Sequence, residues 1–150
     1  MPAIANILPE HELLVSKFEG NVSGDLFLEY YKTLLSFADN SKEFSELVDF
    51  RNVNAIEVEN ATLAVIANTV EAAYKSYKTQ LKCAVVAPSD LAYGLSRMYQ
   101  MDKSPQHIEL KVFRDICEAL AWLGLSSNSL LQQINNLSAD NSSVMLRIAD

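Results

Sequence analysis

The sequence predicts an α/β fold in which a mixed, mostly parallel sheet of about five strands is flanked by about four helices. The main observation is that hydrophobic side chains switch repeatedly between a two-residue and a roughly 3.6-residue recurrence along the chain. The chain has 150 residues, of which 49% are hydrophobic and 21% charged, as in a soluble globular protein with one core. We expect one domain over residues 1–125 and a C-terminal extension over residues 126–150.

Five segments have the composition or the alternation of strands. In chain order they are residues 4–8, 13–18, 46–50, 81–87 and 108–112. The first two are separated by Pro9 and acidic residues, so they can form a hairpin. The run at 81–87 is continuously apolar, which predicts a central strand, whereas the alternating run at 108–112 predicts a strand nearer an edge. We expect Asp49 near the carboxyl end of its strand, which a loop over 51–54 follows.

Four segments place apolar residues at helical spacing. They are residues 26–38, 63–77, 88–101 and 114–123. Ser23 and Asp25 offer N-cap chemistry to the first helix, and Gly124 is a natural stop for the last. Beyond residue 125, the chain forms either an amphipathic helix or a frayed tail. The helix would carry its apolar stripe on Leu130, Leu131, Ile134 and Leu137, docked on its own domain or on a neighbouring subunit.

The charge of the chain argues against nucleic acid as a partner. Twelve Lys and Arg residues against nineteen Asp and Glu residues give a net charge of −7, the wrong sign for a phosphate backbone. The same acidity disfavours anionic membranes but leaves contact through inserted apolar surface open. The N-terminal residues lack the pattern of a signal peptide, and charged or amide residues interrupt every apolar run. We therefore expect a cytoplasmic protein.

The chain also lacks the motifs of common catalytic and cofactor sites. Its four glycines cannot form a dinucleotide-binding or P-loop motif, and its only histidines, His11 and His107, have no zinc-type spacing. We expect no enzyme activity, no cofactor and no metal. A deep polar pocket gathering Asp49, Glu57 or His107 would instead favour an enzyme.

Three segments carry a resemblance to a known family. They are the acid-ended strand LVDF, the segment AVVAPSDLAYGLSRMYQ with Gly94 and Arg97, and VFRDICEALAWL at 112–123. Over about residues 10–125 the chain resembles the SpoIIAA-like (STAS-like) family of small bacterial α/β proteins. The resemblance implies a STAS-like mixed sheet flanked by helices, a fold that is also compared with CRAL-TRIO lipid-binding domains.

The likeness to lipid-binding domains implies a non-enzymatic module for an apolar or lipid-like ligand or a membrane surface. The helix at 88–101 is the expected mobile element. Leu91, Leu95 and Met98 are predicted to pack on the sheet. Tyr93, Arg97 and Met101 fall on a different stripe, where Met and Tyr suit adaptable apolar contacts. The predicted ligand or membrane surface consists of Leu91, Tyr93, Leu95, Arg97, Met98 and Met101.

The alternative is a protein-interaction regulator of the anti-sigma-antagonist type. Such relatives dock a regulatory protein under the control of a phosphorylatable serine where the second helix begins. Here the matching stretch is Glu57-Val58-Glu59-Asn60, which has no serine. Glu57, Glu59 and Thr62 are the predicted docking residues, with Glu59 supplying fixed negative charge at the helix N-terminus. A homodimer formed through the apolar stripe of the C-terminal extension is a further expectation.

Overall fold

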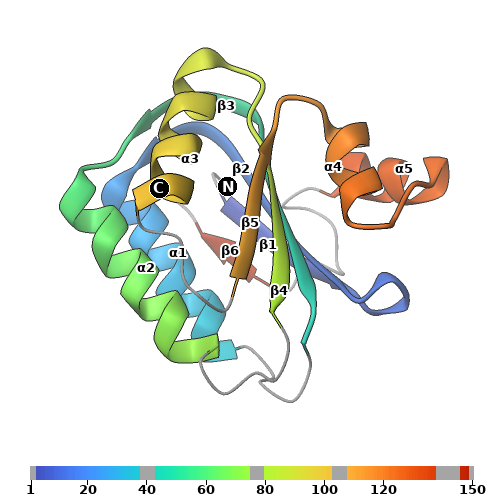
Figure 1. Cartoon of the computed structure of the whole chain (residues 1–150), viewed down its shortest axis with the longest axis horizontal. Helices are drawn as coiled ribbons and strands as arrows, with labels where there is room; N and C mark the ends of the chain where they lie inside the picture. Colours follow the sequence, from blue (N-terminus) through green and yellow to red (C-terminus); the bar gives the residue numbers. More distant parts are fainter. Residues whose placement is uncertain (1–2, 38–42, 75–79, 103–107, 138–145, 149–150) are drawn as a thin grey trace.

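The computed structural model describes residues 3–37, 43–74, 80–102, 108–137 and 146–148. Its centre is a six-stranded sheet of order β5-β4-β3-β2-β1-β6 (Figure 1). The strands β2 to β5 are parallel to one another, whereas β1 is antiparallel to both β2 and β6. The predicted α/β fold with a mixed, mostly parallel sheet is confirmed. The strands are β1 (Ala3–Leu8), β2 (Leu13–Ser23), β3 (Ser45–Glu57), β4 (Leu81–Val86), β5 (Ile108–Phe113) and β6 (Leu146–Ile148).

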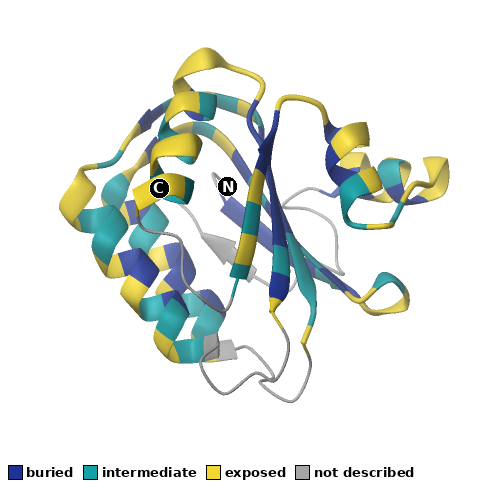
Figure 2. Ribbon diagram, viewed as in Figure 1, coloured by how far each residue is buried: buried dark blue, intermediate teal, exposed yellow. Residues whose placement is uncertain are grey.

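Helices cover both faces of the sheet. The helices α1, α2 and α3 pack on one face of the sheet, and α4 and α5 pack on the other. Parts of the strands between them are coloured as buried (Figure 2). None of the helices in the described ranges combines the length and apolarity that crossing a bilayer requires. The helices are α1 (Gly24–Phe37), α2 (Asn60–Tyr74), α3 (Asp90–Asp102), α4 (Ile116–Trp122) and α5 (Asn128–Asn136).

Short polar side chains cap the N-termini of four of these helices. The Ser23 hydroxyl accepts a hydrogen bond from the backbone N–H of Leu26 at the start of α1. Ser89 does the same for α3, Asp115 for α4 and Ser127 for α5. Each bond satisfies an N–H that the first helical turn leaves without a partner. The positive φ of Gly124, 77°, ends α4 as expected.

The strand β3 is longer than the sequence predicted, because residues 51–54 belong to it and form no loop. It pairs with β2 as far as Glu57, through two register shifts near Gly20, whose φ is +71°. Asn52 and Asn54 are exposed while Val53 between them is half-buried, so this polar stretch is a strand with one wet face. Asp49 consequently lies in the middle of β3, and its predicted place at the carboxyl end is wrong.

Residues 128–137 and 146–148 belong to the same layered body. Leu130, Ile134 and Leu137 are buried against the sheet in the core beneath α4 and α5. Of the alternatives left open for this segment, the structure has the helix docked on its own chain. It also adds β6 beside β1, a sixth strand that the sequence did not predict. The side chains expected to support a homodimer are therefore largely used inside the monomer.

Candidate functional site

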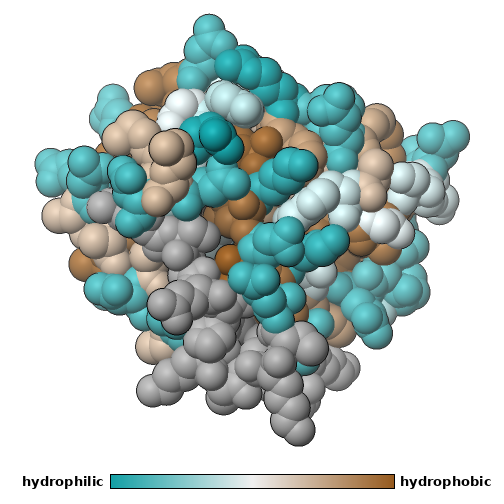
Figure 3. All heavy atoms as spheres, in the orientation of Figure 1, coloured by the Kyte–Doolittle hydropathy of each residue, from teal (hydrophilic) through white to brown (hydrophobic). Residues whose placement is uncertain are grey.

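A cavity of about 90 Å³ lies between the sheet and the three helices α1, α2 and α3. Apolar residues from all these helices and from β3, β4 and β5 line it, and hydrophobic surface is visible in the hollow between α3 and β5 (Figure 3). Alternation along β3 sends Val48 and Phe50 to the cavity, while Leu47 and Asp49 belong to the opposite face. Side chains of the hydrophobic core therefore form most of the cavity lining.

One carboxylate, that of Glu46, lies in this apolar lining. The Ser16 hydroxyl donates a 2.7 Å hydrogen bond to its Oε2, and the Tyr31 hydroxyl lies 3.4 Å from the same oxygen. The Cys83 thiol is 3.8 Å from Oε1 and is a weak donor. Among the residues that the structure describes, the partners of Glu46 at the cavity wall are therefore neutral.

Burial controls the ionisation of the groups around this carboxylate. Burial raises the pKa of Glu46, and the hydrogen bonds from Ser16, Tyr31 and Cys83 oppose that rise. Burial also raises the pKa of Tyr31 and of Cys83 well above their ordinary values, and it raises that of Tyr99 on α3. The hydroxyls and the thiol hence stay neutral at neutral pH, and Glu46 is the group in the described lining that can carry charge.

Two side-chain contacts hold α3 over the cavity. At its start, Arg114 donates to the carbonyl of Pro88 and to the carboxylate of Asp90, and its guanidinium carbon lies 4.3 Å from the centre of the Tyr93 ring. Near its end, the Gln100 amide donates a 2.7 Å hydrogen bond to the backbone carbonyl of Leu110 on β5. The helix is thus fastened to the strand edge by Gln100 beside the cavity.

The inward face of α3 differs from the one predicted. Leu91 and Met98 were expected on the sheet, but 56% and 46% of their surfaces are exposed. Ala92 is buried instead, and Leu95 and Tyr99 line the cavity. Leu95 belongs both to the predicted inward stripe and to the observed one. The prediction chose the wrong stripe because Leu and Met are more apolar than Ala and Tyr.

The remaining predicted ligand residues of α3 divide between the two faces. Tyr93 packs against the core and beneath Arg114, whereas Arg97 and Met101 are exposed. Met101 is 74% exposed, and with Leu91 and Met98 it gives the outer face of α3 an apolar character. Contact of this outer face with a membrane surface stays a prediction.

The predicted docking residues lie together where β3 ends and α2 begins. Glu57 and Glu59 are exposed. Thr62 is half-buried, and its side chain lies beside Gly24 at the start of α1. Their neighbours Val58 and Leu63 line the cavity, so this predicted surface adjoins the cavity wall. Protein docking there stays a prediction.

The carboxylates considered for enzyme chemistry are not brought together. Asp49 lies on the face away from the cavity, Glu57 is exposed at the end of β3, and His107 falls outside the described residues. Within the described ranges no three metal-ligating side chains form a cluster.

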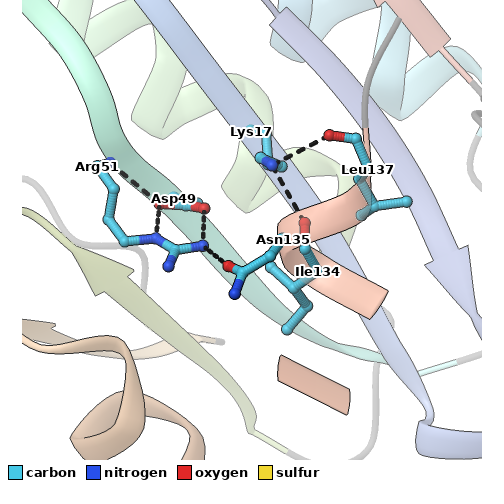
Figure 4. A network of polar contacts seen from close by, with 6 residues as sticks. All are labelled: Lys17, Asp49, Arg51, Ile134, Asn135 and Leu137. Atoms are coloured by element: carbon cyan, nitrogen blue, oxygen red, sulfur yellow. Dashed lines mark hydrogen bonds and ion pairs between the residues drawn. The ribbon is translucent and has the colours of Figure 1, made fainter. Parts of the chain in front are cut away.

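Asp49 serves a polar network that fastens α5 to the sheet (Figure 4). Arg51 donates to both carboxylate oxygens of Asp49 at 3.0 Å and to the Asn135 side chain at 2.8 Å. The Lys17 ammonium donates to the backbone carbonyls of Ile134 and Leu137, both at 3.1 Å. A cation at the last carbonyls of a helix also complements the helix dipole. The network is structural.

Sequence reasoning missed Glu46, the polar residue of the cavity. The signal that could have found it is the strand ELVDF itself. A strand buried on both faces with an acid at its first and fourth positions must place one acid on each face. Asp49 has its cation two residues away in Arg51, whereas Glu46 has no basic residue at such a position.

No family model matches the chain, and no curated protein matches it either. Among solved structures, it is similar to an uncharacterised protein of the DUF3478 family with a SpoIIAA-like fold from Shewanella loihica PV-4, at 17% identity and a TM-score of 0.45 over 74% of this chain and 83% of that one. It is also similar to the anti-sigma factor antagonist SpoIIAA in its unphosphorylated form, at 6% identity and a TM-score of 0.47 over 90% of this chain and 99% of that one. These likenesses agree with the resemblance expected from the sequence and concern the fold alone.

Proposed function

We propose that the chain is a non-enzymatic binding module for a small apolar molecule, or for the apolar part of a larger one, held between α3 and the sheet. The observation that carries the proposal is the cavity of about 90 Å³ with its apolar lining. An apolar cavity of roughly 150 Å³ in another protein stays dry and binds benzene. The cavity described here is smaller, so it suits a compact group whose remainder extends toward the hollow beside α3.

The apolar lining favours such an occupant. An apolar group that enters the cavity leaves water and gains dispersion contacts with the lining. The lining residues are fixed by the sheet and by α1 and α2, so little ordering accompanies binding. The movable part is α3, whose Leu95 and Ser96 form the wall on that side.

Benzene is the probe that tests apolar binding. We expect saturable binding with a Kd on the order of 1 mM. The binding free energy that corresponds to this Kd is well below the maximum that a ligand of benzene's size can reach. The measurement is a titration followed by methyl and aromatic NMR shifts of cavity residues such as Val85 and Leu95. Ser96→Phe, which places a ring in the cavity, is expected to abolish these shifts.

The matched control is Met98→Phe, which adds a ring to the outer face of the same helix. It should bind benzene as the unchanged protein does. Shifts that are linear in benzene concentration, or that survive Ser96→Phe, would contradict the proposed function.

The proposal also makes α3 the mobile element through which the ligand enters. Gln100→Ala removes the hydrogen bond to Leu110, worth about 1 kcal/mol, so both benzene association and dissociation should become roughly fivefold faster. The Kd should stay within about twofold, because an easier opening speeds entry and exit alike. NMR line-shape analysis measures both rates, and Met98→Ala is the control on the outer face. Unchanged rates would mean that the entry path lies elsewhere.

A further inference from the structure

We propose that the polar group of the ligand is a cation: the cavity takes a small apolar amine whose ammonium pairs with the Glu46 carboxylate. The inference rests on the proposed function and names the ligand class of the same site. It starts from the geometry of Glu46: within the described part of the chain, Oε2 accepts from both hydroxyls, whereas Oε1 has the Cys83 thiol at 3.8 Å as its single donor. A carboxylate has about four lone-pair sites, so Oε1 keeps acceptor capacity for a ligand.

The charges around the cavity point to the same class of ligand. Its described lining contains one acid, Glu46, and no Lys, Arg or His. The side chains from α2 and β5, which are Leu63, Ile66, Val70, Ile108 and Leu110, are all apolar. The other titratable groups facing Glu46 are Tyr31 of α1, Cys83 of β4 and Tyr99 of α3, which burial keeps neutral. No protein cation in the described lining balances the carboxylate.

A carboxylate in an apolar wall without a counter-charge is costly, and a cation that pairs with it offsets part of that cost. Hydrogen bonds between ionised partners are roughly twice as strong as those between neutral ones, so an ammonium gains more at Glu46 than a hydroxyl of the same size. A carboxylate ligand would instead meet like charge. The three neutral donors already hold Glu46 in an acceptor role, which an ammonium can use without rearrangement.

The test compares isobutylamine with isobutanol, which share one carbon skeleton. Calorimetric or NMR titration at pH 7 in phosphate buffer avoids competing buffer amines. We expect the amine to bind at least tenfold more tightly than the alcohol. Glu46→Gln should weaken the amine at least tenfold while benzene and isobutanol stay within about twofold.

The outcomes separate the two proposals. If benzene does not bind, the cavity is not a ligand site and the proposed function fails. If benzene binds but the amine shows no advantage over the alcohol, or keeps it in Glu46→Gln, only the amine inference is overturned.

Should Glu46→Gln fail to fold, pH titration of the unchanged protein supplies the same test. Protonation of Glu46 at low pH removes the ammonium's partner, so the advantage of the amine should disappear as pH falls, while isobutanol binding stays constant. An advantage that persists across acid pH would overturn the inference.

Discussion

Phe18→Ala is expected to lower the free energy of unfolding by about 3 to 5 kcal/mol, the largest single effect we foresee. Phe18 on β2 is 2% exposed, and its ring centre lies 5.0 Å from that of Phe27, 4.8 Å from that of Tyr30 and 5.3 Å from that of Phe50. The substitution removes the ring to which the other three pack and leaves a void that fixed neighbours cannot fill. Urea unfolding followed by circular dichroism measures the change.

Phe18→Leu is the matched control, since it keeps an apolar side chain and loses only the ring contacts. It should cost about 1 to 2 kcal/mol. A loss below about 1 kcal/mol for Phe18→Ala would contradict the aromatic cluster as described. Because Phe27 and Phe50 also line the cavity, Phe18→Ala should additionally alter benzene affinity.

Arg51→Met is expected to cost about 3 kcal/mol, at the low end for breaking a buried ion pair. Asp49 is 2% exposed, and the substitution takes the guanidinium from both of its oxygens. The effect stays at the low end because Asp49 keeps the 3.0 Å bond from the backbone N–H of residue 51, and because Lys17 lies opposite it on β2. Equilibrium unfolding in urea measures the loss.

Asn135→Ala is the control, because it removes only the exposed end of the same network and should cost under about 1 kcal/mol. The double variant Asp49→Asn with Arg51→Met should recover part of the loss, since no unpaired carboxylate remains buried. Equal costs for Arg51→Met and Asn135→Ala would show that the buried pair is not what stabilises this face.

Local sequence patterns predicted most of the fold, because the secondary structure of these segments follows from the spacing of their own apolar residues. The continuous run at 81–87 became β4, covered on both faces, and the alternating run at 108–112 became the edge strand β5. The sequence failed where a segment's structure depends on distant partners. Residues 51–54 are polar enough for a loop, but β2 pairs along this part of β3 and continues to Glu57 through the register shifts near Gly20. The pairing of residues 146–148 with β1 likewise has no local signal.

The sequence singled out the helix over 88–101 as part of a ligand surface, and ligand binding there stays a prediction. The residues of this helix that line the cavity are Leu95, Ser96 and Tyr99. Helical spacing identifies the possible apolar stripes of the helix but not which stripe faces the sheet. Here Ala92 is buried, and its small side chain permits close packing. The strand ELVDF indicates one acid on each face, but the tertiary packing shows that the acid facing the cavity is Glu46.

The central claim is that an apolar ligand lies between α3 and the sheet, and a crystal structure of the protein soaked in benzene tests it most directly. The account predicts density for benzene in contact with Val85 of β4 and Leu95 of α3, and none there in crystals of Ser96→Phe. Crystals in which this cavity stays empty while benzene occupies another part of the molecule would contradict it.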